Sequence, residues 1–137
     1  EYKDEIAPVK TFKNPLKNFY FKYIKKQNPY SLEAVEDLLS KFKKNITLLK
    51  GNSNEILKNI ELEKVDFIFI DGGHEYNTVK NDLIHSHKLL KNKGTILCDD
   101  LNLSQALGVR QAIKEFSDEN KLKYEIIHER FAKFDFN

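Results

Sequence analysis

The sequence lacks the features that tie a chain to a membrane, a disulfide framework or a nucleic acid. Cys98 is the single cysteine in 137 residues, which excludes an internal disulfide framework and fits a reducing compartment. No apolar run approaches the ~20 residues of a membrane-spanning helix, and the start shows no signal-peptide pattern. The 23 basic and 21 acidic residues leave a net charge of +2, too balanced to indicate nucleic-acid binding. We therefore expect a cytoplasmic protein with no nucleic-acid or membrane partner.

Glycine is also scarce, and its placement restricts the kind of cofactor site. The five glycines form neither a GxGxxG turn nor a phosphate-binding loop: Gly51, Gly72, Gly73, Gly94 and Gly108. A complete dinucleotide or nucleoside triphosphate site is therefore not expected within this chain. Methionine is absent and the chain starts with Glu1, which we interpret as a sign of truncation or processing.

The length indicates one domain, residues 1–137, and the 40% apolar content is enough for a core. Residues 1–30 are the exception, because three prolines interrupt them and their lysines and aromatics follow no clean period. We expect an irregular N-terminal segment there. Within it, Asn18–Ile24 is compatible with either a strand or an aromatic-rich helix.

From Ser31 onward, helical and strand patterns alternate. The apolar residues at helical spacing and the short β-branched runs predict three longer helices, one short helix and five strands: helices from Ser31 to about Phe42, from a cap at Ser53, over 77–91 and from Gly108; strands over 46–49, 65–70, 95–98, 124–128 and 131–136. The last two strands suggest a hairpin that turns near Glu129 and Arg130. Such alternation is typical of an α/β fold with a parallel sheet.

The strand over 65–70 is the centre of this pattern. It is apolar along its length, which predicts a strand buried on both faces inside a parallel sheet, and it ends at Asp71. Gly72, Gly73 and His74 follow, and Asp99 and Asp100 follow the next strand. Ligands in open α/β sheets bind beyond the carboxyl ends of the strands. We expect the three aspartates to meet there and to need a positive partner, and oxygen ligands suit Mg²⁺ or Mn²⁺. The alternative is that the aspartates only cap the adjoining loops.

We expect the histidines and the cysteine to lie in different environments and to have different roles. His74 can act as a general base near neutral pH, or can simply be hydrogen-bonded in a turn. His85 and His87 are expected at the surface, and Cys98 in the core as a small apolar residue.

The ordered series of motifs resembles class I S-adenosylmethionine-dependent methyltransferases. The similarity covers roughly residues 30–137 and is greatest to the metal-dependent macrocin O-methyltransferase and cephalosporin-hydroxylase-like group. It rests on these pieces in order: Ile70-Asp71-Gly72-Gly73-His74-Glu75-Tyr76, then Val79, Asp82 and Leu83, then Leu89 through Ile96, then Asp99-Asp100, then Gly108-Val109 and Ala112.

The resemblance implies an α/β, Rossmann-like sheet with helices on both faces, and an enzyme that methylates a small hydroxylated substrate. S-adenosylmethionine and Mg²⁺, or another divalent cation, are the implied cofactors. His74 matches the position of a catalytic base, while Asn52, Ser53 and Asp71 match cofactor-binding positions. The implied metal ligands are Asp71, Asp99 and Asp100.

The first two strands of that family's sheet, with the glycine-rich turn and the ribose-binding acid, are not recognisable. We therefore expect a C-terminal portion of the domain that binds S-adenosylmethionine weakly by itself. Three functions stay open: the enzyme, a non-catalytic binding or assembly module, and, ranked last, a metal-dependent hydrolase. Unless its edge is left open to solvent, the strand over 65–70 also needs a neighbour, either Asn18–Ile24 as a replacement strand or a second chain. Of these two we favour association, as a homo-oligomer or with a missing N-terminal portion.

Overall fold

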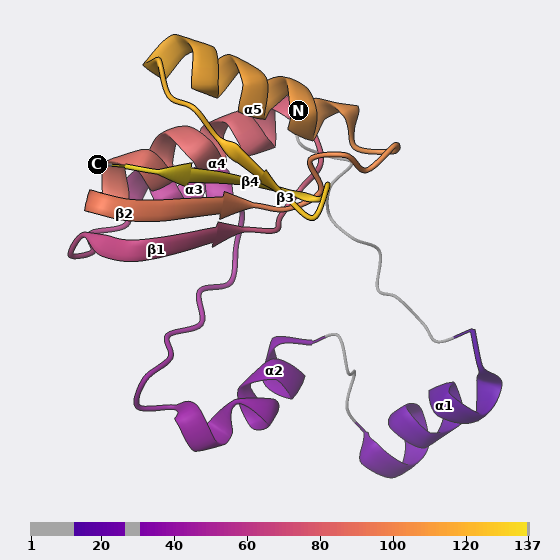
Figure 1. Ribbon diagram of the computed structural model, residues 1–137. Helices are drawn as coiled ribbons and strands as arrows, with labels where there is room; N and C mark the ends of the chain where they lie inside the picture. Colours follow the sequence, from indigo (N-terminus) through magenta and orange to yellow (C-terminus); the bar gives the residue numbers. More distant parts are fainter. Residues whose placement is uncertain (1–12, 27–30, 137) are drawn as a thin grey trace. The chain divides into compact units, whose positions relative to one another are not determined.

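The computed structural model describes residues 13–26 and 31–136, which belong to two compact units, residues 1–50 and 51–137 (Figure 1). No helix within the described ranges is long and apolar enough to cross a membrane.

The regular elements of the first unit are helical among its described residues. The helix α1 (Pro15–Phe19) continues into a π-helical turn (Tyr20–Lys25), and the helix α2 (Leu32–Leu38) is followed by a 3₁₀ turn (Ser40–Phe42). The Ser31 hydroxyl accepts from the Ala34 backbone N–H at 3.3 Å, so the predicted helix start is confirmed. Of the two interpretations of Asn18–Ile24, the aromatic-rich helix is correct.

The strand predicted over 46–49 is wrong, because residues 46–50 adopt neither helix nor strand. A strand is stabilised by backbone hydrogen bonds to a neighbouring strand. Within the described part of the chain no segment pairs with these residues. An apolar, β-branched run alone was therefore not sufficient to form a strand.

The second unit contains a four-stranded sheet in the order β1-β2-β4-β3. Its elements in chain order are α3 (Ser53–Asn59), β1 (Val65–Ile70), α4 (Tyr76–Leu89), β2 (Leu90–Cys98), α5 (Leu107–Asn120), β3 (Glu125–Ile127) and β4 (Phe131–Asp135). The strands β1 and β2 are parallel, whereas β4 is antiparallel to both β2 and β3. The predicted α/β class and the final hairpin are confirmed.

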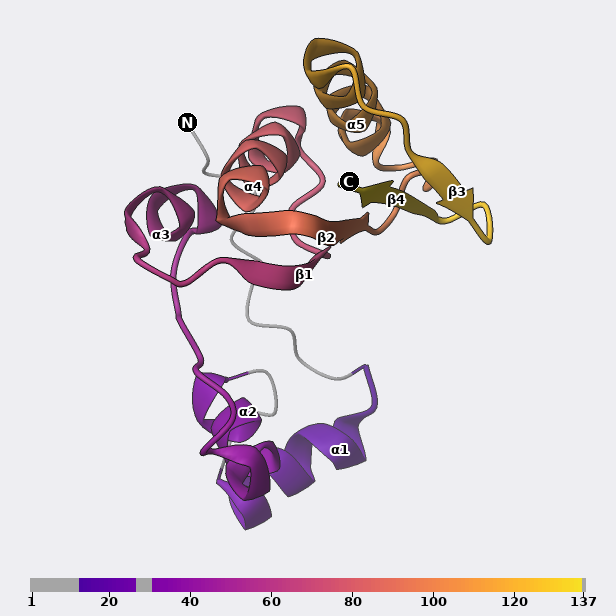
Figure 2. The same cartoon turned by 60° about the vertical axis from the view of Figure 1, so that its left-hand side comes forward.

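The helices α4 and α5 lie over the same face of the sheet, and the core fills the space between them and the strands (Figures 1 and 2). Cys98 is in this core, as predicted, with 1% of its surface exposed. His87 is not the surface residue we expected. Its ring lies 4.7 Å from that of Phe136 and 5.7 Å from that of Phe116, because the last turn of α4 packs against this end of the core.

The strand β2 starts five residues earlier than predicted. Val65 pairs with Leu90, but Phe67 pairs with Thr95, so extra residues of β2 bulge out between the two pairs. Lys93 lies within the bulge and has a positive φ of 69°. The bulge lets α4 lead directly into β2 without a separate loop.

The strand β1 is an edge of the sheet, with β2 on one side only among the described residues. Ile70 on its helix-facing side is buried, whereas Phe67 and Phe69, which alternate with it, are 55% and 48% exposed. Our expectation that β1 is buried on both faces is therefore wrong for this unit. The replacement strand is wrong as well, because Asn18–Ile24 is helical.

Candidate functional site

The carboxyl ends of β1 and β2 lie side by side, as the sequence predicted. Ile70 pairs with Cys98 in parallel register, and the Asp99 backbone N–H donates to the Ile70 carbonyl at 2.9 Å. A cavity of about 10 Å³ opens there, and its lining includes Asp71, His74, Asp99 and Asp100. That volume is enough for a single water molecule. The described cavity is therefore water-sized and not a substrate-sized cleft.

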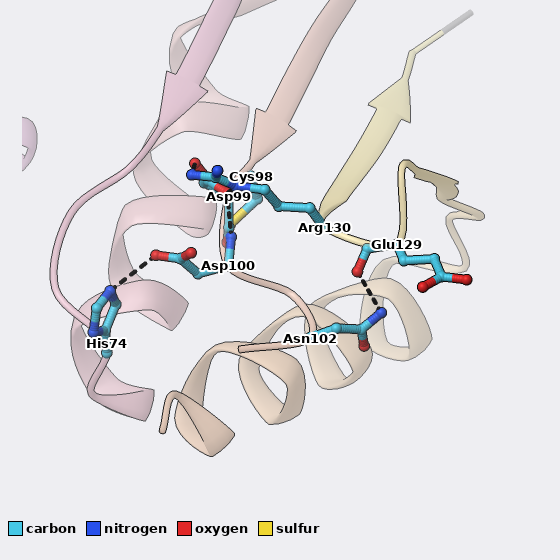
Figure 3. Close-up of polar contacts among 7 residues, drawn as sticks. All are labelled: His74, Cys98, Asp99, Asp100, Asn102, Glu129 and Arg130. Atoms are coloured by element: carbon cyan, nitrogen blue, oxygen red, sulfur yellow. Dashed lines mark hydrogen bonds and ion pairs between the residues drawn. The ribbon is translucent and has the colours of Figure 1, made fainter. Parts of the chain in front are cut away.

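His74 and Asp100 form a direct pair across the two strand ends (Figure 3). His74 Nε2 lies 3.0 Å from Asp100 Oδ2, and about half of the imidazole surface is exposed. The pair has the geometry of a base and the carboxylate that orients it.

Asp100 has a positive φ of 60°. Aspartate tolerates this left-handed conformation better than most residues. Here the Asp100 backbone N–H donates to Asp99 Oδ1 at 2.6 Å. The conformation turns the two consecutive carboxylates toward different partners, His74 for Asp100 and Arg130 for Asp99.

Arg130 binds Asp99 through two charge-assisted hydrogen bonds, a contact that the sequence analysis missed (Figure 3). Its Nε donates to Oδ1 and its Nη2 to Oδ2, both at 2.5 Å. The Asp99 side chain is 3% exposed and that of Arg130 is 59% exposed. Hydrogen bonding to Arg130 holds the pKa of Asp99 below its ordinary value, and the same bonds raise the pKa of Arg130.

One signal could have pointed to Arg130. Three neighbouring carboxylates need a positive charge, and in the final hairpin the antiparallel register pairs Ala132 with Cys98. Arg130 precedes Ala132 by two residues and therefore lies beside the end of β2. The sequence did not reveal that β4 pairs with β2, so the positive partner was assigned to a metal ion instead.

The backbone around Arg130 is attached to the loop that follows β2. The Leu101 N–H donates to the Arg130 carbonyl at 2.9 Å, and the Asn102 side chain donates to the Glu129 carbonyl at 2.6 Å. Arg110 in turn donates to the Asn102 side chain. These contacts hold the hairpin turn next to Asp99 and Asp100.

The metal site predicted at Asp71, Asp99 and Asp100 is not assembled. Among the described residues, no group of three His, Cys, Asp or Glu side chains is placed to hold a metal ion. Both oxygens of Asp99 are hydrogen-bonded to Arg130 and one oxygen of Asp100 contacts His74. The donor set therefore does not fit a divalent cation as it stands.

The predicted cofactor residues lie partly elsewhere. Asn52 caps α3, since its Oδ1 accepts from the Asn54 N–H at 3.0 Å, and Ser53 is the first residue of that helix. The cap is thus one residue earlier than the predicted Ser53. Neither Asn52 nor Ser53 is among the described residues that line the 10 Å³ cavity, whereas Asp71 is. Cofactor binding by these three residues stays a prediction.

The helix α5 supports the segment that carries His74. A Cβ on Gly108 would lie 2.6 Å from the Tyr76 backbone nitrogen and 2.7 Å from the His74 carbonyl oxygen. The Tyr76 hydroxyl donates to Glu115, and this bond raises the pKa of Tyr76. Close backbone packing at Gly108 and the Tyr76 bond thus fix the start of α4 against α5.

Comparisons with known proteins agree with this architecture. The model of a family described as a methyltransferase domain matches residues 9–101. Among solved structures, the chain is similar to the O-methyltransferase NovP, with a TM-score of 0.68 and 11% identity over 97% of this chain and 55% of that one. It is also similar to the apo structure of CalS11, a TDP-rhamnose 3'-O-methyltransferase, with a TM-score of 0.56 and 18% identity over 80% of this chain and 52% of that one.

At these identities the two likenesses show the fold alone. The chain spans about half the length of both structures. A comparison with curated proteins finds no similar sequence.

Proposed function

Because the chain belongs to the methyltransferase-domain family, we propose that it is the C-terminal portion of an O-methyltransferase that acts on a small hydroxylated substrate. The family implies S-adenosylmethionine as the methyl donor. Within the family we assign the chain to the macrocin O-methyltransferase and cephalosporin-hydroxylase-like group. The observation that carries the proposal is the His74–Asp100 pair at the carboxyl ends of two parallel strands.

S-adenosylmethionine, when bound, supplies an electrophilic methyl group. The residues proposed to hold it are Asp71, Asn52 and Ser53. Asp71 and Asn52 are exposed, and the carboxylate, amide and hydroxyl groups of the three suit a cationic cofactor with many hydrogen-bonding groups. The glycine-rich turn seen in the wider family is missing from the sequence, so we expect weak binding of the cofactor to this chain.

His74 is the proposed general base. With Nε2 facing Asp100 Oδ2 at 3.0 Å, Nδ1 accepts the proton of the substrate hydroxyl as the oxygen attacks the methyl group. Asp100 is a positioning residue that orients the imidazole and stabilises its protonated form. The Asp99–Arg130 pair, bonded to the Asp100 backbone through Asp99, keeps this carboxylate in place.

The test is methyl transfer at millimolar S-adenosylmethionine, because weak cofactor binding is expected. Formation of S-adenosylhomocysteine is measured with catechols, phenols and deoxysugars as acceptors. We expect His74→Gln to lower the rate by about 10²- to 10⁴-fold, the usual contribution of a general base. The control His128→Gln, a histidine in the hairpin turn, should leave the rate unchanged. Equal rates for His74→Gln and the wild type would contradict the assignment of the base.

A second candidate function is a non-catalytic binding or assembly module. It is favoured by the exposure of Phe67 and Phe69 on the edge strand β1. The two candidates differ in one measurement. If no acceptor in the panel gives S-adenosylhomocysteine above the background of the His74→Gln variant, while the chain forms a stable complex, the module is the better description.

A further inference from the structure

The cation at the carboxylate cluster is part of the polypeptide. Asp71, Asp99 and Asp100 follow two adjacent strands, and carboxylates so close together repel one another unless a positive charge compensates them. We propose that Arg130 takes the place of a divalent metal ion at this cluster and excludes Mg²⁺ and Mn²⁺ while its contact with Asp99 is intact.

The first observation behind this proposal is the geometry of the contact between Arg130 and Asp99. The guanidinium uses two nitrogens on the two oxygens of Asp99, with both donor–acceptor distances at 2.5 Å. A planar fork of this kind matches a carboxylate better than a point charge does. Both oxygens of Asp99 that a metal would need are therefore already occupied by a cationic donor.

The second observation is that the Asp99 side chain is buried. Its side chain is 3% exposed, and a buried carboxylate is costly unless it is paired. Arg130 supplies that pairing from the solvent side, where 59% of its own side chain is exposed. A metal ion that bound Asp99 would have to displace a partner that is already in place.

The third observation is that the hairpin turn and a neighbouring ring fix the position of Arg130. The Arg130 N–H donates to the Ile127 carbonyl at 3.1 Å, and the two residues between them, His128 and Glu129, have positive φ angles of 51° and 56°. Positive φ at both central residues is typical of a tight type I′ hairpin turn. The guanidinium carbon also lies 5.1 Å from the centre of the Phe131 ring, a cation–π contact. The turn and the ring together hold the guanidinium toward Asp99.

The inference concerns metal binding and holds whether or not the chain transfers a methyl group. The test measures Mn²⁺ binding by calorimetry and by the Mn²⁺ paramagnetic resonance signal, without any substrate. We expect the wild type to bind Mn²⁺ weakly, and Arg130→Gln to bind it about tenfold or more tightly, because the buried Asp99 then lacks a cation. Lys133→Gln is the matched control. It removes the same charge from β4, but Lys133 pairs with Asp135 at 2.7 Å and not with the cluster.

Two further variants locate the effect. The double variant with Arg130→Gln and Asp99→Asn should lose the gain in Mn²⁺ affinity. Arg130→Lys keeps a charge but loses the two-point contact, so its Mn²⁺ affinity should fall between those of the wild type and Arg130→Gln. If circular dichroism shows that Arg130→Gln does not fold, Arg130→Lys replaces it as the test variant. A gain in Mn²⁺ affinity over the wild type is still expected for Arg130→Lys.

Three results would overturn the proposal. The first is tight Mn²⁺ binding by the wild type that is unchanged in Arg130→Gln. The second is a folded Arg130→Gln variant that gains no affinity. The third is an equal gain in Lys133→Gln, which would mean that any loss of positive charge near the sheet is sufficient.

Discussion

At the scale of single residues, the packing of His87 favours the neutral form of its imidazole. The imidazole lies against the rings of Phe116 and Phe136, and burial, followed by the nearby positive charge of Lys64, lowers its pKa below the ordinary value. A histidine with a lowered pKa in the folded state stabilises that state fully above the unfolded pKa of about 6.5. This contribution is lost as the pH falls from there toward the lowered value.

We therefore expect the free energy of unfolding to decrease as the pH falls below about 6.5, and His87→Phe to make this decrease shallower. Phenylalanine keeps a ring between Phe116 and Phe136 but takes up no proton. Urea unfolding at several pH values measures the effect. An unchanged pH dependence in His87→Phe would mean that other groups, such as His85, dominate it.

Cys98 should be unreactive in the folded protein. It is 1% exposed, and burial, with a smaller effect of Asp82 and the site aspartates, raises the pKa of its thiol to about 12. Because the thiolate is the reactive form, we expect no alkylation by iodoacetamide at about pH 8 and complete alkylation in urea. Mass spectrometry of the two samples distinguishes them. Rapid labelling without urea would show that the end of β2 opens readily.

At the scale of elements, the contact between α5 and the start of α4 rests on Gly108. A Cβ at this position would meet the backbone of residues 74–76 at 2.6–2.7 Å, and backbone atoms cannot rotate away as a side chain can. Overpacking of this kind costs about 1–3 kcal/mol. We expect Gly108→Ala to lower the free energy of unfolding by that amount and to displace His74 from Asp100.

Denaturant unfolding of Gly108→Ala measures the change. Lys114→Ala is the control on the same helix, since Lys114 makes only an exposed ion pair with Asp118, and such pairs contribute at most about 0.5 kcal/mol. Equal stabilities of Gly108→Ala and the wild type would show that α5 can shift without cost.

The elements also show which parts of a fold a sequence pattern determines. The helices α4 and α5 were predicted because their apolar residues recur at helical spacing and end up buried, as Val79, Leu83 and Ile113 do. The strand over 46–49 was wrong because strand formation depends on a neighbour that the residues themselves do not encode. The early start of β2 depends likewise on the bulge opposite β1.

The candidate site also contains residues whose place the sequence pattern determines and one, Arg130, whose place it does not. Asp71, Asp99 and Asp100 could be placed together from the sequence, because parallel strands present their carboxyl ends at one edge and these residues follow the strands directly. Arg130 could not, because it reaches the site through the antiparallel register of β4 with β2. The three neighbouring carboxylates indicated a positive charge, but we assigned that charge to a metal ion, since no spacing in the sequence relates Arg130 to Asp99.

At the scale of the whole molecule, the two edge strands of the sheet differ in how readily each would pair with a strand of another chain. The strand β1 has six residues and exposes Phe67 and Phe69, whereas β3 at the opposite edge has three residues. Short edge strands offer few unpaired backbone groups, and long apolar ones are templates for another chain. Association, if it uses an edge, should therefore use β1.

We expect the purified chain to sediment above the monomer mass of 16.1 kDa, in a concentration-dependent manner, through pairing at β1. Phe67→Lys should shift it to the monomer, because an exposed lysine on an edge strand opposes pairing with a second strand. Ile126→Lys is the matched control: Ile126 is 53% exposed on β3, so this variant adds the same charge at the other edge and should associate like the wild type. A monomer at every concentration would refute self-association, and an equal loss in both variants would mean that β1 is not the interface.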